Sequence, residues 1–396
     1  MRVFRRKVRG WILNSDAWYR KIRKEILMKL DAIDKNAEIM GLSAQDREEQ
    51  KDLRSQLHGL LKQVEMKWLQ RYKDKEIKDG DCNTKYYHAK VNGRRRKNRI
   101  LSLEQEEGVI EGKDNLIRYI TDFYKKLFGQ PDTFSINLNI LGGQAITREH
   151  ADTLVKPFSM EELQAVVFGM EKNKSPGPDG IPVDFYQHFW ETVKWDLMKL
   201  LNDFHEGKLD ITRLNYGIIT LVPKSKDAKQ IQKFRPICLL NVSFKIITKV
   251  LMNRLSRIIK PIILPTQTAF IKGRYIMEGI VILHEALNSI HHSKQSVVLF
   301  KVDFEKAYDK IKWPFVYKML KMKQFPDKWC DLVMHTMIGG QVGIKVNDKI
   351  GPYFKTYKGL RQGDSMSPLL FDIAADALAI ILDKAKHAGY VRGGGY

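Results

Sequence analysis

The sequence predicts an α+β protein in which an α-helical hairpin precedes a unit of intermixed helices and strands. Two observations lead to this fold class. Apolar residues recur every three or four positions through the first eighty residues, which is the spacing of one helix face. Beyond residue 157, short runs of β-forming residues alternate with helical patterns. With 396 residues, of which 43% are hydrophobic, the chain has room for two or three domains with real cores.

Charge and cysteine content narrow the classes of function. Lysine and arginine total 68 against 46 acidic residues, a formal charge of +22, and so basic a chain usually binds an anionic partner. No apolar run reaches the roughly 20 residues of a membrane span, and no signal-peptide core follows the basic start. The three cysteines are too scattered for a disulfide framework or a zinc ribbon. We expect an intracellular protein, neither secreted nor membrane-bound, whose charge is compatible with a nuclear location.

Residues 1–80 are predicted to form two antiparallel helices. Asn14 or Ser15 can cap the first helix, and Ser43 with Asp46 resembles a capping box for the second. The first helix has one apolar stripe, made of Ile22, Ile26, Leu30 and Ile33. The second has a longer stripe, made of Leu53, Leu57, Leu60, Leu61, Val64 and Trp68. Packing of the two stripes on each other is the structural interpretation of this leader.

Cations gather in the leader and again at residues 81–100. Residues 1–30 contain ten Lys or Arg against two acids, which a solvated helix face explains as readily as a nucleic-acid contact. Farther on, Tyr86 and Tyr87 precede a run of cations, made of Arg94, Arg95, Arg96, Lys97 and Arg99. Rings stack on unpaired bases and guanidinium groups hold phosphates, so this segment is a candidate RNA-binding site. A nuclear-localisation run or a plain loop is the alternative.

Two strands, 217–223 and 234–240, are predicted to form a hairpin with a lysine-rich connector. Lys224 on this connector is a flexible point charge, whereas Arg235 at the base of the second strand is a fixed planar fork. Together they could grip a polyphosphate. A solvated hairpin tip is the plainer interpretation.

An apolar run of β-forming residues at 297–302 predicts a buried strand that ends at Asp303. A metal or a substrate can approach a carboxylate at the carboxyl end of a strand. The alternative is that Asp303 caps the helix that follows.

The segment before the last predicted helix carries two glycines. A helix is predicted to start with Ser367 as its N-cap and to run to about His387. Helix capping does not explain why Gly359 and Gly363 flank Gln362. Glycine at both places would let the backbone come close to a bound group.

Taken in order, these motifs resemble reverse transcriptases, specifically those of LINE-type non-LTR retrotransposons of the kind found in flowering plants. The matching strings are NKSPGPDGIP (Asn173–Pro182), FRPICLLN (Phe234–Asn241), QTAFIKGR (Gln267–Arg274), the Asp303 segment and Gly359–Pro368. The NTKYYH string (Asn83–His88) resembles the segment that precedes the polymerase in these elements. The likeness implies an RNA-directed DNA polymerase that adds deoxynucleotides to a primer 3′-hydroxyl with two magnesium ions. It implies as partners an RNA template, a DNA primer or RNA/DNA hybrid, and a dNTP, without a membrane.

The resemblance also implies a right-hand polymerase fold and a division of the chain. The predicted parts are a basic helical hairpin at 1–80, a basic and aromatic RNA-binding extension with a linker at 81–157, fingers at 158–290, and a partial palm at 291–396. The palm would hold an incomplete ferredoxin-like sheet. The glycine- and proline-rich stretch 129–157 is the predicted linker.

The resemblance assigns the metal and triphosphate roles to four residues. Asp303 matches the first catalytic aspartate, which binds both magnesium ions. The main-chain carbonyl group of Phe304 would complete one coordination sphere. Arg235 and Lys224 match the residues of the fingers that hold the incoming triphosphate.

The remaining roles concern the sugar and the template. Tyr308 stands where the family keeps an aromatic ring beneath the sugar, which excludes a 2′-hydroxyl group. Gln362 and Gly363 match the loop that lines the nucleotide and the template strand. Asp309 is expected to be structural. Ser365-Met366 replaces the more usual Pro-Leu in this loop.

The second carboxylate pair of the family, on an aromatic-x-Asp-Asp hairpin, is missing: no Asp-Asp pair occurs in the sequence, which ends 33 residues after Gly363. We therefore expect a truncated polymerase domain with weakened magnesium binding and no detectable polymerisation. Val298–Val302 would be an unpaired apolar edge, and the product aggregation-prone. A noncatalytic remnant that binds RNA or RNA/DNA hybrid is the alternative, and an intron-maturase-like splicing helper fits the leader less well.

Overall fold

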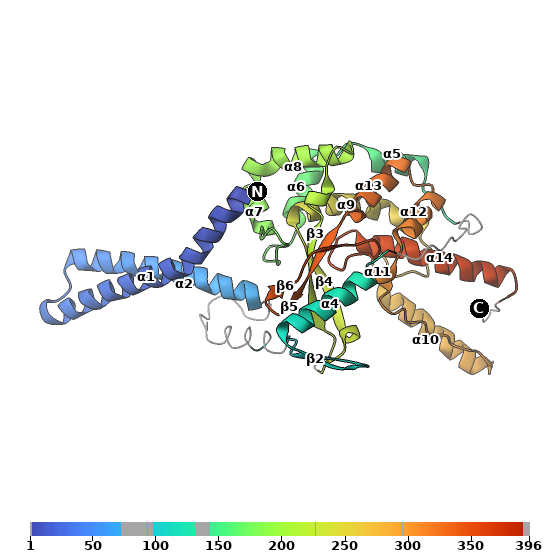
Figure 1. Cartoon of the computed structure of the whole chain (residues 1–396). Helices are drawn as coiled ribbons and strands as arrows, with labels where there is room; N and C mark the ends of the chain where they lie inside the picture. The colour runs from blue at the N-terminus through green and yellow to red at the C-terminus, as the bar shows by residue number, and fades with distance from the viewer. Residues whose placement is uncertain are drawn as a thin grey trace. The chain divides into compact units, whose positions relative to one another are not determined.

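The computed structural model describes residues 2–72, 93, 98–130, 143–225, 227–294 and 296–390. Contacts divide the chain into two compact units, Met1–Arg99 and Ile100–Tyr396. The described part of the first unit is helical, and the second combines helices with strands (Figure 1). The predicted α+β class is confirmed. Among the described residues, no helix combines the length and the apolar character needed to cross a membrane.

The first unit is the predicted helical hairpin, made of α1 (Arg2–Met40) and α2 (Ala44–Tyr72). The Ser43 hydroxyl oxygen accepts a hydrogen bond from the Asp46 amide at 3.1 Å, and the Asp46 carboxylate accepts one from the Ser43 amide at 3.2 Å. This is the predicted capping box. A small core joins the helices, made of Ile26, Leu30 and Leu53 with Ile22, Ile33, Leu57 and Leu60 packed around them. The predicted stripes are confirmed where their side chains are described, except at the exposed Leu61.

The predicted helix cap at Asn14 or Ser15 is wrong, because α1 already begins at Arg2. Arginine and lysine recur between Arg2 and Asn14, and both are good helix formers. The helix therefore continues through the two polar residues that could have started it.

The sheet of the second unit has the strand order β4-β3-β5-β6, and β7 pairs with β5. Its strands are β3 (Tyr216–Pro223), β4 (Phe234–Leu240), β5 (Gln341–Val346), β6 (Lys349–Ile350) and β7 (Phe354–Lys355). β3 pairs antiparallel with β4 and parallel with β5, so it lies between two neighbours. The predicted hairpin of 217–223 and 234–240 is confirmed. A separate hairpin consists of β1 (Ser102–Gln105) and β2 (Gly108–Glu111).

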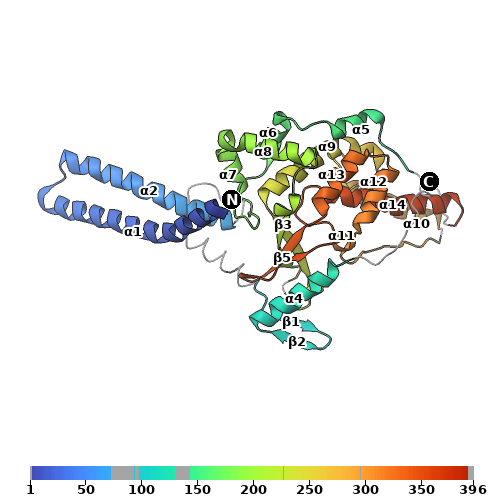
Figure 2. The same ribbon diagram turned by 45° about the horizontal axis from the view of Figure 1, so that its top comes forward.

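Helices surround the sheet. They are α4 (Lys113–Leu127), α5 (Arg148–Val155), α6 (Met160–Gly169), α7 (Val183–His188), α8 (Trp190–His205), α9 (Val242–Ile262), α10 (Ile276–Ser293), α11 (Ala307–Lys310), α12 (Trp313–Met322), α13 (Asp327–Met337) and α14 (Ser367–His387), with short 3-10 helices at Ile211–Arg213 and Ile231–Lys233. In Figure 1 and Figure 2, α6, α8, α9 and α13 gather at one end of the sheet, and α4 lies against β5 at the other. One hydrophobic core joins these elements.

The sequence strings that carry the family resemblance make hydrogen bonds between loops and their neighbouring elements. Asn241, directly after β4, accepts a hydrogen bond from the Asp179 amide at 3.0 Å. Gln267 donates a hydrogen bond to the buried Asp372 carboxylate of α14 at 2.7 Å. Arg274 donates to four main-chain carbonyl groups, those of Lys260, Ile263, Leu264 and Gln267. These polar contacts connect the loops to one another and to α14.

The segment after α10 departs from the prediction. Residues 296–304 have no regular secondary structure, and Val298 and Phe300 are 87% and 83% exposed. The predicted buried strand ending at Asp303 is therefore wrong. A strand needs hydrogen-bonding neighbours, and no strand in the described ranges pairs with this segment. The expectation that Val298–Val302 is apolar, exposed and unpaired agrees with this geometry.

Two smaller boundaries also differ from the prediction. The stretch 129–157, predicted as a linker, contains α5, which Thr147 caps by accepting a hydrogen bond from the His150 amide at 3.3 Å. α14 begins at Ser367, one residue earlier than predicted, and ends at the predicted His387.

Candidate active site

Asp303 and Phe304 lie at the end of the unpaired segment, and both side chains are exposed. Within the described ranges, no three His, Cys, Asp or Glu side chains converge as metal ligands would. Magnesium at phosphate-transfer sites takes one or two carboxylates, and water and substrate phosphates complete its shell. The roles of the Asp303 carboxylate and the Phe304 carbonyl group as magnesium ligands stay predictions.

The hairpin of β3 and β4 carries the cations predicted to hold a triphosphate. Arg235 is exposed, whereas its neighbours Phe234 and Pro236 are buried. This alternation follows from the pleat of a strand, which points successive side chains to opposite faces. Lys224 extends the hairpin, because its amide donates a hydrogen bond to the Lys233 carbonyl group at 2.9 Å.

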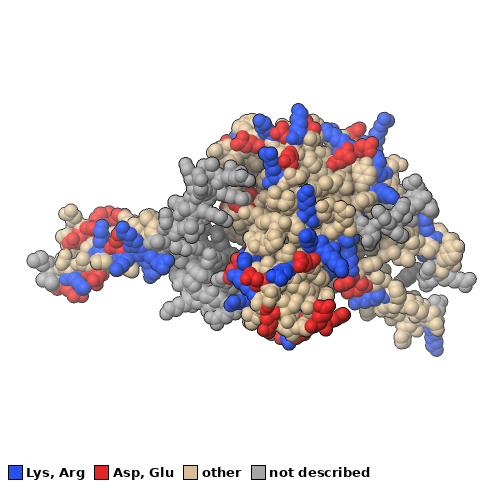
Figure 3. Space-filling view, in the orientation of Figure 1, with Lys and Arg blue, Asp and Glu red and all other residues tan. Residues whose placement is uncertain are grey.

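The charge of Lys224 acts on two of the residues that follow Asp303. An ion pair with Lys310 at 2.9 Å lowers the pKa of Glu305, and the charge of Lys224 lowers it further. Burial lowers the pKa of Lys306, and Lys224 again contributes. Figure 3 shows lysine and arginine side chains gathered near the middle of the second unit, around the place of α4 and α11 in Figure 1. Such a surface suits an anionic ligand.

The loop before α14 packs on β4. The Gln362 carbonyl group accepts a hydrogen bond from the Cys238 amide at 2.7 Å. Gly363 has a φ of +118°, and a Cβ atom there would lie 2.5 Å from the Cys238 carbonyl oxygen. At Gly359, with a φ of +90°, a Cβ atom would lie 2.8 Å from the Asp309 carbonyl oxygen. Both glycines permit a close approach to protein backbone; their approach to a bound group stays a prediction.

Tyr308 connects the Asp303 segment to this loop. Its ring stacks on Phe371 of α14, with centroids 4.3 Å apart and planes inclined by 6°. Its carbonyl group accepts a hydrogen bond from the Leu360 amide at 2.7 Å. Burial raises the pKa of the Tyr308 hydroxyl group to about 12, so the ring is neutral at physiological pH. A supported, neutral ring can restrict the shape of a ligand that lies on its free face.

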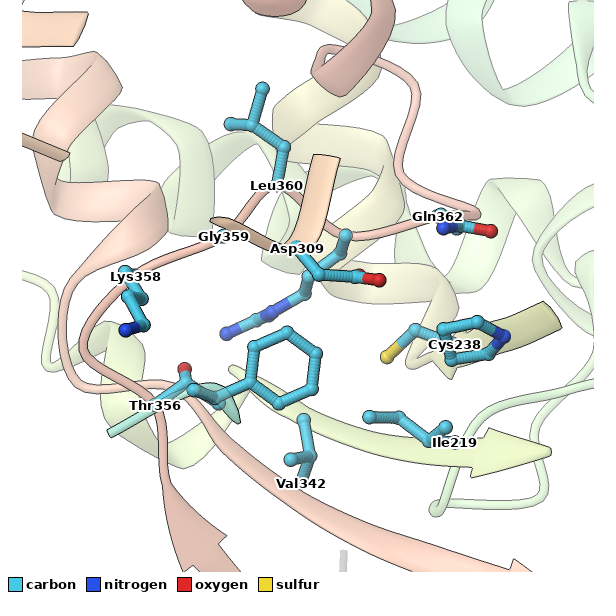
Figure 4. Close-up of a pocket in the computed structure, with 12 residues that line it drawn as sticks. Ile219, Cys238, Asp309, Val342, Thr356, Lys358, Gly359, Leu360 and Gln362 are labelled. Carbon is cyan, nitrogen blue, oxygen red and sulfur yellow. The ribbon is translucent and has the colours of Figure 1, made fainter. Parts of the chain in front are cut away.

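Asp309 and Arg361 line a small cavity behind the loop (Figure 4), with about 20 Å³ open to water, room for one water molecule. Asp309 is 3% exposed, and its Oδ2 atom has no hydrogen-bond partner among the described residues. Burial raises the pKa of this carboxyl group to about 6. Arg361 donates a hydrogen bond to the Asn215 side-chain oxygen, while its Nη2 atom has no partner in the described ranges. The burial of Asp309 fits the structural role expected for it.

Three residues near the site were not predicted as functional residues from the sequence. The ring of Phe371 stacks on Tyr308, and the side chain of Arg361 lines the small cavity. Lys306 makes a cation–π contact with Phe123 of α4. Arg361 has one weak signal, its place between two glycines of the Gln362 loop. The contact partner of each lies far away in the sequence, so spacing alone could not identify it.

Some predicted nucleic-acid contacts lie outside the described residues, namely Tyr86, Tyr87, Arg94, Arg95, Arg96 and Lys97. Arg99 is described and exposed. All seven therefore stay predictions.

Comparison with protein families decides the class of this site. Residues 222–391 match the family described as reverse transcriptase (RNA-dependent DNA polymerase). This segment of the chain is similar to reverse transcriptase domains. The matched residues include the two predicted triphosphate ligands, Lys224 and Arg235. They also include Asp303, Tyr308 and the Gln362 loop.

Proteins of retrotransposable elements are similar to longer stretches of the chain. The chain is 25% identical over 311 residues to the transposon TX1 uncharacterized 149 kDa protein of Xenopus laevis, a match that covers 77% of this chain and 24% of the relative. It is 24% identical over 278 residues to the Retrovirus-related Pol polyprotein from the type-2 retrotransposable element R2DM of Drosophila melanogaster; the match covers 69% of this chain and 24% of the relative. A third relative is the Retrovirus-related Pol polyprotein from the type-1 retrotransposable element R2 of Nasonia vitripennis, 24% identical over 225 residues; the match covers 57% of this chain and 21% of the relative. The predicted likeness to non-LTR retrotransposon reverse transcriptases is confirmed, and the chain spans about a quarter of the length of these curated relatives.

Proposed function

We propose that this chain is the nucleotide-holding part of an RNA-directed DNA polymerase of a non-LTR retrotransposon. The reaction is transfer of a deoxynucleotide to a primer 3′-hydroxyl, with an RNA template and a DNA primer, or their hybrid, as partners. One observation carries the proposal. The Gln362 loop meets the segment after Asp303, because the Leu360 amide donates a hydrogen bond to the Tyr308 carbonyl group at 2.7 Å, within the residues that match the reverse transcriptase family.

Arg235 and Lys224 are the proposed ligands of the triphosphate. Arg235 is exposed on a strand that is itself hydrogen-bonded, so its planar guanidinium group starts from a fixed backbone. Lys224 lies beyond the end of β3 and can adjust to the position of the phosphates. A rigid fork and a flexible point charge together suit an extended polyphosphate.

Asp303 and the carbonyl group of Phe304 are the proposed protein ligands of magnesium. When bound, the metal neutralises phosphate charge and lowers the pKa of the attacking hydroxyl group. The exposed carboxylate of Asp303 is open to a hydrated ion that arrives with the nucleotide.

Tyr308 is the proposed selector of deoxyribose. Its ring stacks on Phe371 with centroids 4.3 Å apart, and its main-chain carbonyl group accepts a hydrogen bond from the Leu360 amide at 2.7 Å, so the ring has little room to yield to a 2′-hydroxyl group. Gln362 and Gly363 would line the nucleotide and the template from the loop that packs on β4. The rigidity of these contacts supports a shape-selective site.

We also propose the division of the chain that the family resemblance implies. Fingers would occupy 158–290 and the first part of the palm 291–396. The basic hairpin at 1–80 precedes both in the sequence. The extension at 81–157 would contact RNA through its tyrosines and cations. Binding of this kind should weaken steeply with salt, because cations that neutralise phosphates release counterions.

The test is the affinity of the chain for dTTP with magnesium and poly(rA)/oligo(dT), measured for the wild type and Arg235→Ala. Loss of a charge-assisted contact, about 1.5–3 kcal/mol, should raise the Kd for dTTP roughly 10- to 100-fold. The Kd for the template–primer should change less than about threefold, because template contacts extend over many residues.

Arg213→Ala is the matched control. Arg213 is an exposed arginine of the same unit, paired with Asp210 at 3.2 Å and outside the segment that matches the polymerase family. Its removal should leave dTTP binding unchanged. Equal dTTP affinity in the wild type and Arg235→Ala would remove the proposed nucleotide site.

A further inference from the structure

The C-terminal end of α4 contacts two loops of the proposed nucleotide site. α4 (Lys113–Leu127) precedes residues 222–391, the part of the chain that matches the polymerase family. Three aromatic residues lie at this end, Phe123, Tyr124 and Phe128. Tyr124 and Phe128 are buried in the main core and stack at 5.9 Å, so the end of the helix is rigid.

Phe123 holds Lys306. The Lys306 Nζ atom lies 3.9 Å from the centroid of the Phe123 ring and 5.7 Å from that of Tyr124. This is a short cation–π contact, and it is half-buried, where such contacts are stronger than at exposed sites. A leucine at position 123 could fill the same apolar space, but it has no ring face to attract the ammonium group.

The backbone of Lys306 also requires support. Its φ is +51°, a left-handed conformation that is costly for a residue with a side chain. The Lys306 carbonyl group starts α11 by accepting hydrogen bonds from the amides of Asp309 at 3.0 Å and Lys310 at 3.1 Å. The conformation of Lys306 therefore sets the path of the chain from Asp303 to Tyr308.

Phe128 contacts the second loop. Its carbonyl group accepts a hydrogen bond from the Tyr357 amide at 2.9 Å. Its ring is so close to Gly359 that a Cβ atom on that glycine would lie 3.1 Å from the ring. The two loops are also joined directly, because the Leu360 amide donates to the Tyr308 carbonyl group at 2.7 Å. The end of α4 thus supports both loops at the point where they meet.

We propose that Phe123 is a positioning residue for nucleotide binding: by holding the Lys306 ammonium group against its ring, it fixes the Asp303–Tyr308 segment against the Gln362 loop. The inference rests on the proposed nucleotide site and extends it to an element outside the matched polymerase segment. It assigns the ring a role through Lys306, without contact between Phe123 and the nucleotide.

The experiment compares Phe123→Leu with Phe123→Trp, which keeps a ring face. The Kd for dTTP is measured with magnesium and poly(rA)/oligo(dT), at a temperature where circular dichroism shows every variant fully folded. Phe123→Leu should raise the Kd for dTTP about fivefold, and Phe123→Trp should stay within about twofold of the wild type. Lys306 lies over the rings of Phe123 and Tyr124, so Tyr119→Leu, which removes a ring one turn earlier in the same helix, should also stay within about twofold.

A double-mutant cycle separates positioning from simple packing. Lys306→Met should weaken dTTP binding by about the same factor as Phe123→Leu, and the double variant should be no weaker than either single variant, because both remove one contact. Wild-type affinity in Phe123→Leu, an equal loss in Phe123→Trp, or additive losses in the double variant would overturn the inference.

Arg235→Ala distinguishes failure of this inference from failure of the proposed function. If Arg235→Ala weakens dTTP binding and Phe123→Leu does not, the nucleotide site stands and the role of Phe123 is wrong. If neither variant changes dTTP binding, the proposed nucleotide site is wrong and the positioning role falls with it.

Discussion

Of two runs of β-forming residues in the second unit, one forms paired strands and the other does not. The hairpin of β3 and β4 is a paired strand unit, with Ile219 4% exposed and opposite Cys238 in the register. The segment 296–304 has an equally apolar sequence, yet it has no regular secondary structure, and Phe300 is 83% exposed. One of these regions carries the proposed triphosphate ligands, and the other carries the proposed metal ligand.

The difference shows that neighbours, more than composition, decide whether a strand forms. β3 lies between β4 and β5, so the backbone groups on both edges are paired and both faces can pack. A single extended segment gains neither the ladder of hydrogen bonds nor cross-strand packing, whatever its β-propensity. In the described ranges, 296–304 has no such neighbour.

The largest effect is expected in the hairpin. Ile219→Ala removes a buried side chain from the main core, and such truncations cost about 2–5 kcal/mol of the free energy of unfolding. Urea unfolding monitored by circular dichroism measures this loss. A loss below about 1 kcal/mol would mean that β3 is packed more loosely than its burial indicates.

Asp309 lines a small cavity together with Ile219 and Cys238 of the hairpin, and it should make stability depend on pH. Its pKa in the folded protein is raised from 3.8 to about 6, chiefly by burial. As the pH rises from 4 to 6, the unfolded chain ionises first, so this group lowers stability progressively, by up to about 3 kcal/mol, and then has a constant effect above pH 6.

Asp309→Asn removes this titration. The unfolding free energy of the variant minus that of the wild type should therefore rise between pH 4 and pH 6 and level off above. Urea unfolding at four pH values across this range measures the difference. A difference that does not vary with pH would show that the carboxyl group is not held protonated by burial.

The smallest effect on stability is expected in the unpaired segment. Phe300→Ser changes an exposed side chain, so the free energy of unfolding should change by no more than about 0.5 kcal/mol. Self-association should decrease, because exposed apolar segments with free backbone groups promote aggregation. Analytical ultracentrifugation of the wild type and variant measures this change. A monodisperse wild type, or a large loss of stability in the variant, would mean that this segment is packed after all.

Local patterns predicted the elements whose signals lie within one stretch of sequence. The capping box at Ser43, the stripe around Leu30 and the end of α14 at His387 depend on neighbours within a few turns, so spacing sufficed. The strands 217–223 and 234–240 were predictable for the same reason, since a short connector joins them.

Contacts between distant residues could not be predicted in this way. The ring of Phe371 under Tyr308 and the ring of Phe123 under Lys306 join residues 63 and 183 positions apart in the sequence. The wrong prediction of a strand at 296–304 has the same cause, because strand formation depends on a neighbouring strand that the local sequence does not specify. The wrong cap at Asn14 reflects a local competition, in which good helix formers outweighed capping residues.

The central claim is that this chain binds a deoxynucleotide under the direction of an RNA template. The most direct test is to measure the Kd for dTTP and for dGTP with magnesium, first on poly(rA)/oligo(dT) and then on poly(rC)/oligo(dG). The account predicts that dTTP binds more tightly on the first template and dGTP on the second, and that Arg235→Ala weakens both matched pairs. Equal affinity for the two nucleotides on both templates would contradict it.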